Sequence, residues 1–216
     1  MKWWDGDKVK QIYTPSIQEL ETISSKFNDH NDWSKKCFSE FKENLKEHMR
    51  TVQNNKCCYC KKELFHDIGE VDIEHILSKS KFPTFTFYPL NLALSCRSCN
   101  TKKGSKSVLV KNQISEYPVH GNAYSIVHPN IDNFNEHLAI NEGYVFEALT
   151  SKGSHTITVC ELFRLKEVMK RNNAHKMREL EQTQQKLDEA ITENSLLKEL
   201  MARVSALEEE MNARKS

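Results

Sequence analysis

Two Cys-x-x-Cys pairs give this chain four thiolates at a spacing that suits metal binding. Cys57 and Cys60 form the first pair, and Cys96 and Cys99 form the second. Two such pairs are typical of a structural Zn²⁺ site, in which four sulfur ligands complete a tetrahedron and leave no position open for a substrate. We therefore predict a zinc ion that joins two segments of the chain and takes no direct part in chemistry.

Polar residues between and beside these pairs could carry out hydrolysis. Glu74 and His75 lie between the pairs, Asn91 follows them, and Asn100 comes directly after Cys99. Carboxylate and amide oxygens suit Mg²⁺ or Mn²⁺, and a neutral imidazole can take a proton from an attacking water molecule. These residue types predict metal-assisted hydrolysis of a phosphodiester. The rate should fall below about pH 6.5, where an unperturbed imidazole becomes charged.

The same part of the chain is locally basic, although the formal net charge of the whole chain is only +1. No Asp or Glu occurs from His75 to Ser115, and this run carries Lys79, Lys81, Arg97, Lys102, Lys103, Lys106 and Lys111. A phosphate polymer is the partner that such a run favours, and the first six of these residues are the candidate nucleic-acid contacts. The alternative is a solvated lysine-rich loop without a ligand.

The segment from Cys57 to Gly104 resembles the HNH (ββα-metal) nuclease family. That resemblance implies that His75 is the general base, that Glu74 and Asn100 bind one catalytic Mg²⁺ or Mn²⁺, and that Asn91 holds the loop that orients His75. Asp72 matches an acidic position two residues before the metal ligand, which gives it a supporting role. Asn100 stands where the family name would place a histidine. DNA is the default substrate, while RNA remains open.

A second resemblance extends beyond this segment. The stretch from His128-Pro129 to His137, together with Cys160 to Leu165, is similar to the PtuB-like nuclease subunits of Septu and retron-associated antiphage systems. This implies an ATPase partner (PtuA-like) and a role as nuclease effector in antiviral defence. From the residues themselves, the segment around His128 predicts a turn with hydrogen-bonded side chains rather than a second metal site.

The elements around the site predict an α+β protein, with a mainly helical chain around a small zinc-stabilised ββα-metal core and a long C-terminal helix. Four parts are expected: an N-terminal helical region at 1–55, the HNH nuclease core at 56–112, a loop-rich α/β extension at 113–160, and a helix or coiled coil at 161–216. The last part contains neither Gly nor Pro and could pair with a partner protein or with a second copy.

Hydrophobic periodicity predicts individual elements within these parts. One helix should begin behind Pro15-Ser16, and a second should run from about Trp33 to Gln53, with Cys37 buried beside its apolar stripe. Tyr144–Leu149 and His155–Val159 favour a small hairpin.

Two other functions fit the same residues. The chain could be an autonomous HNH endonuclease of a restriction system or mobile element, with the long helix forming a homodimer. It could also be a zinc-ribbon adaptor that binds nucleic acid without cutting it. No apolar stretch reaches the roughly 20 residues of a membrane span. The odd number of cysteines, seven, favours metal ligation over disulfides and therefore the reducing cytoplasm.

Overall fold

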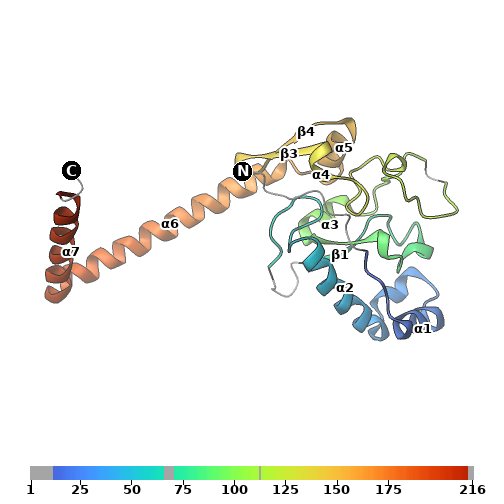
Figure 1. Cartoon of the computed structure of the whole chain (residues 1–216), viewed down its shortest axis with the longest axis horizontal. Coiled ribbons are helices and arrows are strands. Elements are labelled where there is room, and N and C mark those ends of the chain that lie inside the picture. The colour runs from blue at the N-terminus through green and yellow to red at the C-terminus, as the bar shows by residue number, and fades with distance from the viewer. Residues whose placement is uncertain (1–11, 66–70, 112, 214–216) are drawn as a thin grey trace. The chain divides into compact units, whose positions relative to one another are not determined.

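The computed structural model describes residues 12–65, 71–111 and 113–213, and it divides into two compact units, residues 1–165 and 166–216 (Figure 1). The helices and strands are α1 (Ile17–Lys26), α2 (Ser39–Val52), β1 (Val71–His75), β2 (Leu92–Cys96), α3 (Arg97–Lys103), α4 (Phe134–His137), β3 (Leu138–Asn141), β4 (Val145–Ala148), α5 (Ser151–Val159), α6 (Arg164–Glu193) and α7 (Ser195–Ala213). The predicted α+β fold class, with its small core and long C-terminal helix, is confirmed.

The N-terminal helices form where their caps and apolar stripes predict. Ser16 caps α1, because its hydroxyl accepts a hydrogen bond from the Glu19 amide while the Glu19 carboxylate accepts one from the Ser16 amide. In α2, every third or fourth residue is apolar, and the resulting stripe is buried. The α-helix begins only at Ser39, later than predicted, because Asp29 caps a separate 3₁₀ turn, His30–Ser34.

Cys37 is exposed, which corrects the prediction of a buried thiol. The short 3₁₀ turn Lys36–Phe38 directs Phe38 into the core, where it is 1% exposed. Adjacent residues of a helical turn cannot share one face, so Cys37 is left at the surface.

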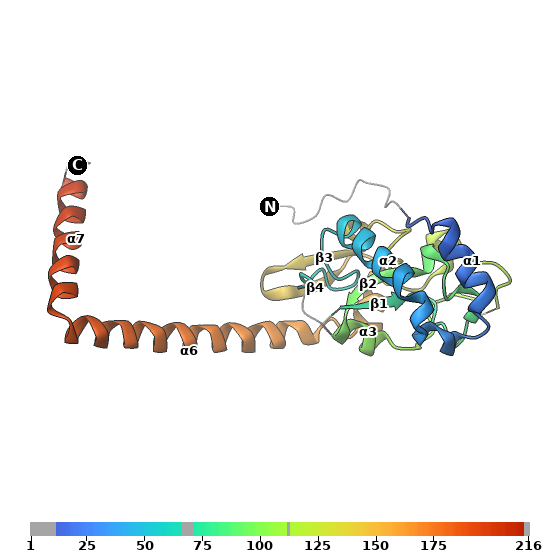
Figure 2. The same ribbon diagram turned by 90° about the horizontal axis from the view of Figure 1, so that it is seen from below.

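The centre of the first unit is a two-stranded antiparallel ribbon followed at once by a helix. β1 pairs with β2 in a register that places Val71 opposite Cys96 and His75 opposite Leu92, and α3 begins at the next residue. Helix α2 lies on one side of this ribbon and α3 on the other (Figure 2). Gln53, at the end of α2, ties this helix to β2, since its side chain hydrogen-bonds both the N–H and the C=O of Leu94.

The extension contains a hairpin and a helix. The strands β3 and β4 form the hairpin, with Leu138 opposite Ala148. Residues 155–159 were predicted as a strand but lie in α5, so this prediction is wrong. Thr150 caps the helix by accepting a hydrogen bond from the Gly153 amide, and the Thr156 hydroxyl accepts one from the Val127 amide. These contacts override the strand preference of the β-branched residues.

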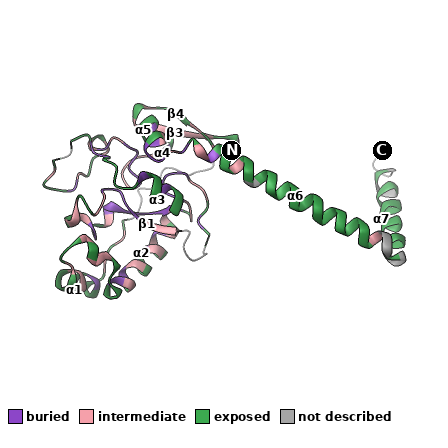
Figure 3. Ribbon diagram, turned by 180° about the vertical axis from the view of Figure 1, so that it is seen from behind, coloured by how far each residue is buried: buried purple, intermediate pink, exposed green. Residues whose placement is uncertain are grey.

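The second unit is helical, and its long helix is divided at Asn194. The Asn194 side chain accepts a hydrogen bond from the Leu197 amide, so this residue acts as the N-cap of α7 and ends the continuous helix. Most of α6 and α7 is exposed in Figure 3, including Leu180, Leu187 and Leu200. Among the described helices none is both long and apolar enough to cross a membrane.

Candidate active site

The four predicted zinc ligands lie together. Their Sγ atoms are all within 4.8 Å of one another, and Cys60 and Cys96 are 3.9 Å apart. Tetrahedral zinc with bonds of about 2.3 Å requires sulfur atoms about 3.8 Å apart, so the cluster fits this ion. The Cys58 amide donates to the Leu94 carbonyl, which fixes the first pair against β2, and Cys96 is the last residue of that strand. These cysteines could therefore hold a structural zinc ion.

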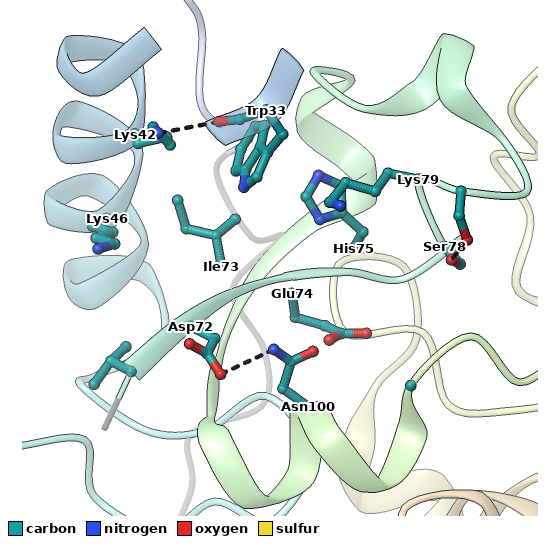
Figure 4. A pocket seen from close by; sticks show the side chains of 13 residues that line it. Trp33, Lys42, Lys46, Asp72, Ile73, Glu74, His75, Ser78, Lys79 and Asn100 are labelled. Carbon is teal, nitrogen blue, oxygen red and sulfur yellow. Dashed lines mark hydrogen bonds between the residues drawn. The ribbon is translucent and has the colours of Figure 1, made fainter. Parts of the chain in front are cut away.

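A pocket of about 470 Å³ lies beside β1 and is lined by three of the four predicted catalytic residues, Glu74, His75 and Asn100, whereas Asn91 lies outside its lining. Alternate residues of the strand point to opposite sides, as Figure 4 shows: Asp72 and Glu74 face α3, whereas Ile73 and His75 face α2. Asn100 extends from α3, and its amide nitrogen donates to an Asp72 carboxylate oxygen at 2.9 Å. The structure thus brings Asp72, Glu74 and Asn100 to one wall of the pocket.

This wall offers oxygen atoms to a hard cation. Two carboxylates and one side-chain amide are the ligand types that Mg²⁺ and Mn²⁺ prefer, and such ions usually keep several water molecules. The Asn100 amide donates to Asp72 through its nitrogen, so its oxygen is the atom directed to a cation. Asp72, predicted to have a supporting role, lies directly against Asn100 and is a candidate ligand in its own right.

The Glu74 carboxylate has a buried counter-ion, Lys103. The Lys103 ammonium lies 2.6 Å from the Glu74 carboxylate, and these side chains are 1% and 2% exposed. Lys103 also donates to the His75 carbonyl at 2.5 Å, and the Tyr59 hydroxyl donates to Glu74. Lys103 was predicted to contact nucleic acid, and its burial corrects that prediction. Burial raises the pKa of the Glu74 carboxyl, while the adjacent ammonium opposes the rise.

The His75 ring is buried and held in one orientation. One ring nitrogen, Nε2, lies 3.1 Å from the Thr86 carbonyl oxygen. A carbonyl only accepts hydrogen bonds, so Nε2 carries the proton and Nδ1 carries the lone pair. The ring packs edge to face on Trp33, with centroids 4.6 Å apart. Burial, reinforced by the charge of Lys79, lowers the pKa of His75 to about 3. The expectation of activity lost below pH 6.5 assumed an unperturbed imidazole, and this lowered pKa favours activity that persists at lower pH.

Asn91 closes the loop that carries Thr86. Its side-chain oxygen accepts from the Leu77 amide at 2.7 Å, and its nitrogen donates to the carbonyls of Leu77 and Phe85. The residue is fully buried, at 0% exposed. Because Phe85 precedes Thr86, these bonds fix the carbonyl that orients His75.

A second layer, from the extension, supports Asn91. The Tyr117 hydroxyl lies 3.3 Å from the Asn91 side-chain oxygen and 2.8 Å from His128 Nε2. The Asn130 amide donates to His128 Nδ1, and its side chain donates to the carbonyls of Leu90 and Leu92. The segment around His128 is therefore a hydrogen-bonded turn, as predicted. Its link to Asn91 was missed, because no local pattern connects residues that lie about 40 positions apart.

The other predicted nucleic-acid contacts are spread over the surface. Lys79 lines the pocket, and Lys81 and Arg97 are exposed. Lys102 and Lys106 both pair with Glu161, at 2.9 and 3.8 Å.

Among the pocket residues that were not predicted, three come from a distant part of the chain. Trp33, Lys42 and Lys46 come from the N-terminal helical region, outside the segment with the recognisable motifs. The one sequence signal that could have grouped Lys42 with Lys46 is helical periodicity, which places both on one face of α2.

Comparisons with known proteins agree with this geometry. Residues 57–106 match the HNH endonuclease family. Over 161 residues the chain is 27% identical to the Septu protein PtuB of Bacillus thuringiensis, and the match covers 73% of this chain and 54% of that protein. The chain thus spans about half the length of this relative. The resemblance predicted from the sequence is confirmed on both counts.

Proposed function

We propose, from the premise that residues 57–106 form an HNH endonuclease domain, that the chain hydrolyses phosphodiester bonds in DNA with the help of a divalent cation. The observation that carries this proposal is the pairing of a neutral, oriented imidazole with an oxygen-rich wall in one pocket. A zinc-binding adaptor without catalytic activity would need the zinc cluster and the lysines, but not this arrangement.

The residues have distinct roles in the proposed reaction. His75 Nδ1 accepts a proton from the attacking water, while the Thr86 carbonyl and the Trp33 ring keep the imidazole in place. Asp72, Glu74 and Asn100 would hold Mg²⁺ or Mn²⁺, which neutralises charge on the scissile phosphate and the leaving oxygen. Asn91 holds the loop that orients the base. Because burial lowers the pKa of His75 far below neutral pH, the imidazole is neutral and can accept a proton.

Cleavage of supercoiled plasmid DNA tests the proposal. The purified chain should nick or linearise the plasmid with Mg²⁺ or Mn²⁺, and His75→Ala should lower the rate by about 10²–10⁴, the usual contribution of a general base. The zinc content of the variant should match that of the parent. Equal rates for the two proteins would show that His75 is not the base.

The cellular role rests on the similarity to PtuB and on the second unit. We propose that the chain is the nuclease effector of a bacterial antiphage system and acts in the cytoplasm, with an ATPase subunit that binds α6 and α7. These helices expose Leu180, Leu187, Leu200 and Val204. Co-expression with a PtuA-like ATPase should give a complex that protects cells from phage. If the chain purifies as a homodimer and does not bind the ATPase, this result favours an autonomous nuclease.

A further inference from the structure

The pocket beside β1 has two chemically different halves. Asp72, Glu74 and Asn100 form the half toward α3, which carries negative charge and suits a cation. The half toward α2 is formed by Trp33, Lys42, Lys46 and Lys79, and no carboxylate lines it. Ile73 and His75 lie at the boundary between the halves (Figure 4). An anion entering the pocket is therefore repelled from one half and attracted to the other.

The cations of the α2 half are held in place. The Lys42 ammonium donates to the Trp33 carbonyl at 3.2 Å and lies 5.7 Å from the centre of the Trp33 ring. Lys46, one turn further along α2, is half-buried as a residue and makes no ion pair or hydrogen bond with any residue that the structure describes. A lysine buries its aliphatic stem more readily than its ammonium, so the Lys46 ammonium at the pocket is available to an anionic ligand.

Trp33 adds a neutral donor to this half. Its indole nitrogen points toward the space between Ile73 and His75 in Figure 4, and it has no hydrogen-bond acceptor among the described side chains and backbone groups. The nitrogen is not among the buried unsatisfied atoms, so it is open to a ligand. An indole N–H can only donate, and therefore it adds to the preference for an anion.

We propose that Trp33, Lys42 and Lys46 form a phosphate-binding subsite for the nucleic-acid strand next to the scissile bond. This inference rests on the proposed nuclease function, and it assigns to the N-terminal helical region a part of the site that lies outside residues 57–106. Lys42 and Lys46 lie about 6 Å apart along the helix axis, so they contact two positions of one strand. The subsite recognises the phosphodiester backbone and not the bases.

Salt-dependent binding tests the subsite separately from cleavage. Fluorescently labelled duplex and single-stranded oligonucleotides are titrated with the full chain in buffer without added Mg²⁺ or Mn²⁺, over a series of KCl concentrations. Each lost phosphate contact lowers the slope of log K against log[salt] by about 0.9 for duplex and about 0.7 for a single strand. The double variant Lys42→Ala/Lys46→Ala should therefore lose about 1.8 of slope with the duplex and about 1.4 with the single strand.

Two further variants make the result specific. Lys36→Ala removes an exposed lysine that precedes α2 and does not line the pocket, and its slope should equal that of the parent. Trp33→Phe keeps an aromatic ring against His75 but removes the N–H. It should weaken binding severalfold without changing the slope, because a neutral donor releases no counter-ion.

The binding experiment tests the subsite, and plasmid cleavage independently tests the nuclease function. An unchanged slope in the double variant, or an equal loss in Lys36→Ala, overturns the subsite even if His75→Ala abolishes cleavage. Conversely, if the chain never cuts DNA but the double variant shows the predicted loss of slope, the subsite stands and the nuclease assignment is wrong. Circular dichroism and zinc content, matched to the parent, confirm that each variant is folded.

Discussion

Replacing Lys103 with methionine should destabilise the fold strongly, although the replaced residue is a lysine. Its ammonium lies 2.6 Å from Glu74, and both side chains are almost completely buried. Removing one partner of such a pair typically costs about 3–5 kcal/mol, because the other charge stays buried without compensation. The Tyr59 hydroxyl remains hydrogen-bonded to Glu74 and favours the lower end of this range. The melting temperature should fall by roughly 6–20 °C.

Urea unfolding followed by tryptophan fluorescence and circular dichroism measures this loss. Lys102→Met is the matched control, since Lys102 is the preceding residue of α3 and its pair with Glu161 is exposed. That variant should unfold at nearly the same urea concentration as the parent, because an exposed ion pair contributes little to stability. The double variant Glu74→Gln/Lys103→Met should lose less than the sum of the two single variants, because it leaves no isolated charge.

The loss in Lys103→Met should also depend on pH. Burial already raises the pKa of the Glu74 carboxyl, and removing the ammonium that opposes the rise raises it further. The folded variant then binds the Glu74 proton more tightly than the unfolded chain, so the stability deficit shrinks as the pH is lowered. A deficit below about 1 kcal/mol at neutral pH, with a normal zinc content, would refute the buried ion pair.

Four other results follow from the site. Cys99→Ser should release zinc and abolish cleavage by unfolding the core, whereas His75→Ala should abolish cleavage with zinc retained, as metal analysis by mass spectrometry would show. Because the pKa of His75 is lowered to about 3, the base stays neutral and the cleavage rate should change less than about threefold between pH 8 and 5; a midpoint near 6.5 would contradict this. His75 binds a proton below about pH 6.5 in the unfolded chain but only near pH 3 in the folded chain. The free energy of unfolding should therefore fall with decreasing pH by up to about 1.4 kcal/mol per pH unit, and His75→Gln should show a shallower slope. Tyr117→Phe removes the hydroxyl that contacts both His128 Nε2 and the Asn91 side-chain oxygen and should cost about 1–3 kcal/mol in thermal unfolding, and a loss within error would show that the network is not buried as described.

The parts of the site that were predicted from sequence depend on local spacing. The spacing of two Cys-x-x-Cys pairs predicted the cluster of four cysteines that could hold zinc, and this prediction did not depend on the residues between the pairs. The start of α1 was also predicted from local sequence, because Pro15-Ser16 stand directly before its apolar rhythm, and the structure adds Glu19 as the second half of the cap.

The parts that were missed depend on contacts between distant segments. Lys103 looked like a surface lysine, and only its approach to Glu74, 29 residues earlier, makes it a buried counter-ion. Residues 155–159 have strand-forming side chains, but the cap at Thr150 and the contact between Val127 and Thr156 select a helix. The lowered pKa of His75 likewise comes from burial, which the residue type does not reveal.

The exposure of Cys37 has a practical consequence for measurement. Of the seven cysteines, four belong to the zinc cluster and Cys58 and Cys160 are buried, so Cys37 is the one thiol that a maleimide dye can reach in the folded chain. It lies immediately before α2, the helix that carries Lys42 and Lys46. A single fluorophore could therefore be attached without engineering the sequence, and its emission would report on events at the α2 side of the pocket in real time.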